Sequence, residues 1–183
     1  MFPTRATEAA RVRLFQSRRR ASRDRRGSCR ACGWRAERGW EVTGIDVVEK
    51  ALRRARERVG EAGVEVQLVQ GDVTALRQAG IGAGFRLLVD TGTFHGLTDA
   101  QREAMGREVS AVAAPDATVI LDCFAPRRRG PLPRGASRAD VQRAFPGWEI
   151  AGVEVADTEP DPIARLFKFE ESFYRLRREG RSR

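Results

Sequence analysis

The chain has 183 residues, 41% of them hydrophobic, and a formal net charge of +9. This length suits one domain with a sizeable core and is short for two. No apolar run is long enough to cross a bilayer or to form the core of a secretory signal, so we expect no membrane segment.

The positive charge is concentrated at the N-terminus. Residues 1–35 hold 11 arginines against two acids, whereas residues 36–183 hold 23 basic and 23 acidic side chains. A neutral body argues against a nucleic-acid partner, and dense charge with little to bury favours disorder. We therefore expect residues 1–35 to be a basic tail that is disordered or mistranslated, ahead of a folded domain at 36–183.

Three cysteines are too few for a disulfide framework in a chain of this size. A reducing compartment fits this cysteine content, so we expect a cytoplasmic protein. We also expect it to be a monomer.

Predicted strands and helices alternate from residue 36 to residue 124. The apolar patterns predict strands at 41–46, 64–72, 85–90 and 117–124. They predict helices at 48–59, at 73–79 and from Thr98, where Gln101 completes a capping box. Such β-α repeats are typical of a mostly parallel sheet covered by helices on both faces.

The pattern changes after residue 124. A loop rich in proline and arginine leads to a short helix capped by Ser137, with Asp140 at the box position. Residues 148–157 and 171–179 then alternate like the strands of an antiparallel pair. The sequence therefore predicts a three-layer α/β sandwich that ends in an antiparallel strand pair.

Three acids stand at the ends of three successive predicted strands: Asp46, Asp72 and Asp90. In open parallel sheets, ligands bind beyond the carboxyl ends of the strands. Each acid alone could simply cap the helix that follows. All three together, in this order, favour a cofactor site.

The runs "GWEVTGID", "VQGDV" and "LLVDTGTFHGL" resemble the second, third and fourth motifs of class I S-adenosylmethionine-dependent methyltransferases. The resemblance points to the small bacterial branch related to thiopurine and tellurite-resistance methyltransferases, and it covers residues 36–178. It implies a Rossmann-like fold, S-adenosyl-L-methionine as cofactor and a small-molecule methyl acceptor.

The resemblance also implies roles for individual residues. Asp46, with the adjoining Val47, would hold the ribose hydroxyls. Asp72 would face the adenine amino group, with the Val73 backbone beside the ring. Asp90 and Thr91 would lie beside the methionine part of the cofactor and its sulfonium.

His95 is the only histidine of the chain and follows the predicted strand at 85–90. At the ligand end of the sheet it could accept a proton from a hydroxyl or amine acceptor, although a lone histidine is more often structural. We expect the neighbouring Phe94 to pack in the hydrophobic core. The pair Cys29 and Cys32 lacks two further ligands, so we expect no metal site.

The family's first motif is a strand followed by a glycine-rich turn, and it has no counterpart here. Between Met1 and Cys32 the only glycine is Gly27, and the arginine-rich run at 18–28 cannot form a buried strand. We therefore expect the first strand of the sheet to be absent and methyl transfer to be impaired.

Two other functions remain open. An NAD-dependent oxidoreductase would also place an acid such as Asp46 on a ribose, but it needs the same missing glycine turn. A non-enzymatic protein could use the basic arm to bind nucleic acid, although no aromatic residues are interleaved with the arginines.

Overall fold

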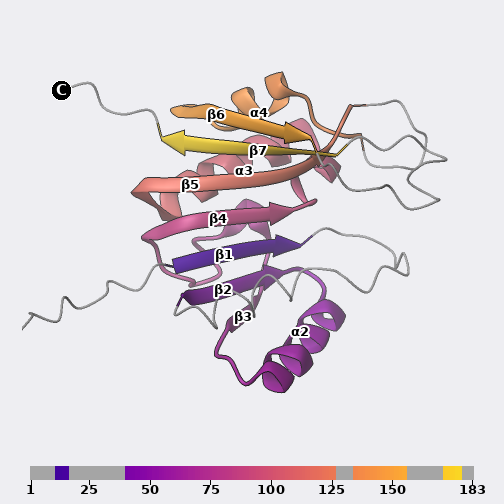
Figure 1. The fold of residues 1–183 in the computed structure, drawn as a ribbon, viewed down its shortest axis with the longest axis vertical. Helices are drawn as coiled ribbons and strands as arrows, with labels where there is room; N and C mark the ends of the chain where they lie inside the picture. The colour runs from indigo at the N-terminus through magenta and orange to yellow at the C-terminus, as the bar shows by residue number, and fades with distance from the viewer. Residues whose placement is uncertain (1–10, 17–39, 127–133, 156–170, 179–183) are drawn as a thin grey trace, which may run out of the picture.

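The computed structural model describes residues 11–16, 40–126, 134–155 and 171–178. Its centre is one mixed sheet with the strand order β3-β2-β1-β4-β5-β7-β6 (Figure 1). The strands are β1 (Arg11–Gln16), β2 (Glu41–Asp46), β3 (Gln67–Gln70), β4 (Phe85–Thr91), β5 (Ala113–Phe124), β6 (Trp148–Val155) and β7 (Glu171–Arg178).

The sheet runs parallel from β3 to β5, and β7 pairs antiparallel with both β5 and β6. Helix α2 (Glu49–Ala62) follows β2, α3 (Asp99–Val112) precedes β5, and α4 (Arg138–Ala144) precedes β6. Two 3-10 turns, η1 (Val73–Ala75) and η2 (Phe94–Gly96), follow β3 and β4. The three-layer α/β sandwich with its antiparallel C-terminal pair is confirmed.

Strand β1 corrects the expectation that the first strand is absent. It lies between β2 and β4, where Leu14 pairs with Gly44 on one side and with Val89 on the other (Figure 1). The arginine-rich run that cannot form a strand begins only after Gln16, so it does not exclude a strand before it. The sheet therefore begins inside the segment expected to be a tail, and the expected disorder is wrong for residues 11–16.

Both predicted capping boxes are present. The Thr98 hydroxyl oxygen accepts a hydrogen bond from the Gln101 N–H, and the Gln101 side-chain oxygen accepts one from the Thr98 N–H, at the start of α3. Ser137 and Asp140 make the same reciprocal pair at the start of α4. Each box satisfies backbone N–H groups that the first turn of a helix leaves unpaired.

The hydrophobic core has two parts, one on each face of the sheet. Helices α3 and α4 cover one face, where Met105 and Val141 join a cluster with Ile45 and Leu121. On the other face a smaller cluster is built on Val42 and Val89, with residues of α2 packed against it. Because alternate strand residues point to opposite faces, the site residues at the strand ends divide between these two layers.

Among the described residues, no helix is both long enough and apolar enough to span a bilayer. Apart from β1, the tail expected at residues 1–35 lies outside the described part of the chain, as do Cys29 and Cys32.

Candidate functional site

The three strand-end acids lie at one edge of the sheet, as predicted. Ile45 of β2 and Asp90 of β4 both pair with Phe15 of β1, which places Asp46 one position further toward the carboxyl edge. Asp46 itself pairs with Gln70, the last residue of β3, and Asp72 follows two residues later. Parallel pairing through β1 therefore brings all three acids to the same edge.

Asp46 is buried between β2 and α2. Its Oδ1 accepts a hydrogen bond from the Val48 N–H at 2.8 Å, and its backbone oxygen accepts one from the Gly71 N–H at 3.1 Å. Burial raises the pKa of the Asp46 carboxyl, and the N–H groups of Val48 and Val47 oppose that shift. The β2–α2 turn thus holds a carboxylate in place at the edge of the sheet.

The turn after β3 packs closely against Ile45 and Val47, the residues on either side of Asp46. The Gln70 side-chain amide donates to the Val47 carbonyl at 3.2 Å. A Cβ atom at Gly71 would lie 2.8 Å from Cδ1 of Ile45, so any side chain at this position would require the Ile45 side chain to shift. The positions of Asp46 and Asp72 are therefore coupled.

Asp72 caps the η1 turn. Its Oδ1 accepts hydrogen bonds from both the backbone N–H and the hydroxyl of Thr74, each at 2.8 Å. The following Val73 is buried in the core. Capping, which the sequence left open as an alternative for each acid, is thus seen for Asp72, whose side chain remains exposed.

Asp90 is fully buried, and both of its carboxylate oxygens accept backbone hydrogen bonds. Oδ1 accepts from the Thr93 N–H at 3.0 Å and Oδ2 from the Phe94 N–H at 2.8 Å. Burial raises its pKa to about 6, against the effect of these hydrogen bonds. Asp90 therefore shapes the turn that leads into η2. Strand alternation places Thr91, rather than Asp90, on the sheet face of Asp46.

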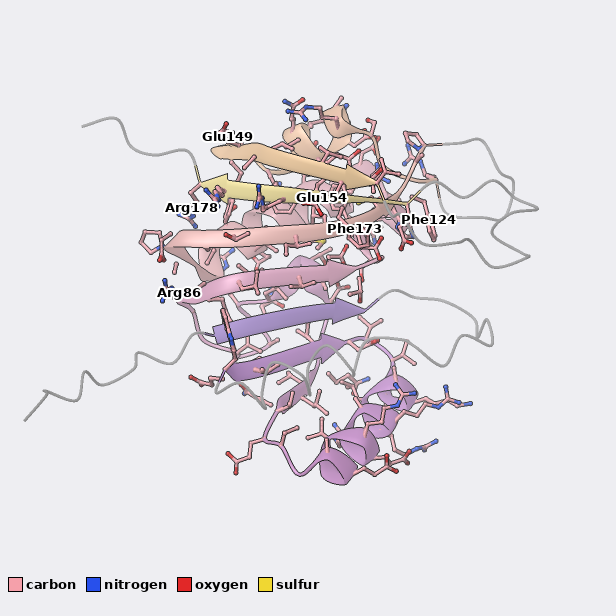
Figure 2. The ribbon with its side chains drawn as sticks, in the orientation of Figure 1. Arg86, Phe124, Glu149, Glu154, Phe173 and Arg178 are labelled. Atoms are coloured by element: carbon pink, nitrogen blue, oxygen red, sulfur yellow. The ribbon has the colours of Figure 1, made fainter. Side chains whose placement is uncertain are left out.

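His95 is buried in the η2 turn and contacts the end of β5. Its Nδ1 accepts a hydrogen bond from the Phe124 N–H at 3.3 Å, and the two rings lie 4.5 Å apart. Figure 2 shows Phe124 at this edge of the sheet and Arg86 at the opposite edge. With the Nδ1 lone pair engaged, the neutral ring carries its proton on Nε2. This geometry does not leave Nδ1 available as a proton acceptor.

Sequence reasoning missed Arg102 of α3. Its side chain is only 4% exposed, and it donates to three carbonyl oxygens, those of Phe94 at 3.1 Å, His95 at 3.1 Å and Gly135 at 2.5 Å. Burial lowers the pKa of the guanidinium, and the nearby Asp140 opposes that shift. A signal was present in the sequence, because an arginine three residues before Met105 falls on the apolar face of the predicted helix.

Phe94 belongs to the core, as expected, with its ring 5.9 Å from that of Phe145. Within the described ranges, no three side chains of the His, Cys, Asp and Glu types are grouped so that they could hold a metal ion.

Residues 26–116 match a family model described as a methyltransferase domain. Two uncharacterized methyltransferases of Schizosaccharomyces pombe are each 27% identical over 89 residues, which is 49% of this chain and 60% of theirs. The chain thus spans less than two thirds of the length of the curated relatives it matches.

Solved structures share the fold at low identity. A structure from work on a thioacetal conversion in echinomycin biosynthesis is 18% identical, with a TM-score of 0.68 over 95% of this chain and 78% of that one. Magnesium protoporphyrin IX methyltransferase of Synechocystis with bound S-adenosylmethionine is 17% identical, with a TM-score of 0.66 over 93% and 71%. An N-methyltransferase of Bradyrhizobium japonicum with S-adenosyl-L-homocysteine is 16% identical, with a TM-score of 0.66 over 94% and 80%.

Proposed function

We propose that this chain, whose residues 26–116 match a methyltransferase-domain model, is a class I S-adenosylmethionine-dependent methyltransferase that transfers the methyl group of S-adenosylmethionine to a small-molecule acceptor. The observation that carries the proposal is the convergence of Asp46, Asp72 and Asp90 at the carboxyl edge of the sheet in strand order. The family match gives no support to an NAD-dependent oxidoreductase.

The residues at this edge fit the nucleoside half of the cofactor. A carboxylate can accept hydrogen bonds from both hydroxyls of a ribose, and Asp46 is anchored by the Val48 N–H where such a group would lie. We propose that Asp72, two residues beyond β3, faces the adenine amino group with the Val73 backbone beside the ring. Thr91 would lie beside the methionine part, on the same sheet face as Asp46.

When bound, S-adenosylmethionine supplies an activated methyl group, so the protein's main task is to align the acceptor with it. Asp90 contributes through structure: its carboxylate fixes the turn that presents His95. We propose that His95 helps to form the acceptor side of the site through its contact with Phe124. We also propose that the protein acts in the cytoplasm as a monomer.

The residues after β1 do not fit the methionine half of the cofactor. Class I enzymes are expected to place bare glycine backbone there, but residues 17–26 hold six arginines and no glycine. Each backbone hydrogen bond that is lost costs about 1 kcal/mol of affinity. We therefore propose that this chain binds S-adenosylmethionine weakly.

Titration calorimetry with S-adenosylmethionine tests the proposal. Asp46→Asn should weaken binding at least about tenfold, because it removes a charged acceptor from the ribose hydroxyls. Asp116→Asn is the matched control, since this exposed carboxylate pairs with Arg86 at the opposite edge of the sheet (Figure 2). Equal loss in both variants, or none in either, would contradict the assignment.

A second experiment identifies the acceptor. The chain should form S-adenosylhomocysteine when it is mixed with S-adenosylmethionine and a panel of small thiols, phenols and amines. Replacing residues 17–26 by a glycine-containing turn should raise both cofactor affinity and the rate. Tight binding by the unaltered chain would instead show that these ten residues can hold the cofactor without glycine.

A further inference from the structure

We propose that Arg102 is a positioning residue for the acceptor side of the site, which it holds together by bridging two segments that meet at the carboxyl edge of the sheet. This proposal rests on the function proposed above. The two segments are the η2 turn with His95, and the stretch of Gly135 and Ala136 that leads into α4.

The guanidinium of Arg102 reaches both segments at once. Its Nε donates to the Phe94 carbonyl, and one terminal nitrogen, Nη2, donates to the carbonyls of both His95 and Gly135. The carbon Cζ also lies 5.2 Å from the centre of the Phe94 ring. The partners come from residues 94–95 and residue 135, so this one side chain links parts of the chain that are about forty residues apart.

The charge of Arg102 has carboxylate partners on its own helix, α3, and on α4. Its Nη1 lies 3.7 Å from a carboxylate oxygen of Asp99 and 3.6 Å from one of Asp140. Asp140 also accepts from the Ser137 N–H at the start of α4. The planar guanidinium group therefore has carboxylates on one side and carbonyl oxygens on the other.

Other contacts show that the same segments have little freedom to move apart. The Phe124 N–H donates to His95, and the Phe124 carbonyl accepts from the Ala136 N–H at 2.8 Å. Gly135 has a φ of +77°, and a Cβ atom there would lie 2.3 Å from the Ala125 carbonyl oxygen. The end of β5 is thus enclosed between the two segments that Arg102 bridges.

The expected effect of Arg102 is on the acceptor and not on the cofactor. Asp46 ends β2 and Asp72 follows β3, and their carboxylates accept hydrogen bonds from Val48 and Thr74 rather than from Arg102. Displacing a reacting group by about 1 Å can slow a reaction by about 100-fold. Loss of the bridge should therefore slow methyl transfer while leaving the affinity for the nucleoside half unchanged.

The test uses the full chain with Arg102→Gln and Arg102→Lys, and Arg107→Gln as the control on the exposed side of the same helix. Glutamine lacks the charge and the planar guanidinium group. Lysine keeps the charge but can donate to only some of the three carbonyl oxygens. His95 is the only histidine, so nitrogen NMR of its imidazole reports this turn without ambiguity. S-adenosyl-L-homocysteine is the binding probe.

We expect the wild type and Arg107→Gln to show one imidazole form with Nδ1 as acceptor and a Phe124 amide protected from exchange. Arg102→Gln should lose that form and that protection, and Arg102→Lys should recover part of both. The dissociation constant for S-adenosyl-L-homocysteine should stay within about twofold, and transfer to an acceptor found in the panel should slow by about 10- to 100-fold. If Arg102→Gln does not fold, the same measurements on Arg102→Lys test the proposal.

An unchanged imidazole signal in a folded Arg102→Lys and Arg102→Gln pair would overturn the proposal. So would a loss of S-adenosyl-L-homocysteine affinity as large as the loss of transfer rate, because that result would mean a general loss of structure. If no acceptor is methylated at all, the proposed function fails, while the NMR measurements still decide whether Arg102 positions His95.

Discussion

Asp90 combines full burial with two backbone hydrogen bonds, which gives the protein an unusual dependence on pH. A carboxylate that accepts two N–H groups is held in its charged form by them, yet burial dominates and raises its pKa to about 6 from 3.8. The folded protein therefore binds a proton here more tightly than the unfolded chain does. The consequence is a stability contribution that is present in acid and lost at neutral pH.

The contribution of Asp90 to the free energy of unfolding should be complete below about pH 4 and should disappear as the pH rises through 6. The full change corresponds to about 3 kcal/mol between pH 4 and pH 7.5. Asparagine cannot titrate, so the difference between wild type and Asp90→Asn should move in favour of Asp90→Asn as the pH rises. Urea unfolding at pH 4, 6 and 7.5 measures it, and parallel pH profiles would contradict the raised pKa.

Sequence patterns located the acids but not their partners. Strand-end placement was enough to bring Asp46, Asp72 and Asp90 to one edge, because parallel strands end on the same side. It could not show that Asp90 is engaged on both oxygens by the next turn, or that Arg102 reaches Gly135. Such contacts depend on how loops return to the sheet, which periodicity does not encode.

Helices α3 and α4 cross at a glycine. A Cβ atom at Gly106 would lie 1.7 Å from the carbonyl oxygen of Ala144 and 2.7 Å from its carbonyl carbon. These are backbone atoms, so the two helices would have to separate to accept any side chain here. Gly60 of α2 is the opposite case, since nothing lies within 4 Å of a Cβ atom built on it.

Alanine at these two helical glycines should therefore change stability in opposite directions. Gly106→Ala should lower the free energy of unfolding by about 3 kcal/mol, because the packing of α3 on α4 is overfilled. Gly60→Ala should raise it by about 0.5–1 kcal/mol, since alanine has less backbone freedom to lose in a helix. Urea denaturation of both variants measures the pair. Two changes of the same sign would show that the α3–α4 crossing is not as close as described.

The starts of the helices were predictable from the sequence, and the first strand was not. A capping box such as that of Thr98 and Gln101 is a local signal, complete within four residues. Strand β1 has only six residues and carries Arg11 and Arg13, so its composition resembles the basic run that follows. What makes it a strand is pairing with β2 and β4, which are distant in sequence.

The whole molecule depends on β1 because this strand joins two parts of the sheet. On one side lie β2 and β3, and on the other lie β4, β5, β7 and β6 (Figure 1). The smaller core cluster spans the join, since Val42 comes from β2 and Val89 from β4. The edge that holds Asp46 and Asp90 exists only if the join is intact, so the candidate site and the fold share one requirement.

Proline at Leu14 should break this join. Leu14 pairs with strands on both sides, and proline has no N–H to donate to a ladder, so it is not tolerated in a central strand. We expect Leu14→Pro to abolish cooperative unfolding, measured by circular dichroism during urea titration, and to abolish S-adenosyl-L-homocysteine binding with it. Val155→Pro is the control, at the exposed end of β6, where the described strands pair with it on one side only, and it should unfold cooperatively with a smaller loss. A Leu14→Pro chain as stable as the wild type would mean that the sheet forms without β1, as the arginine-rich sequence first suggested.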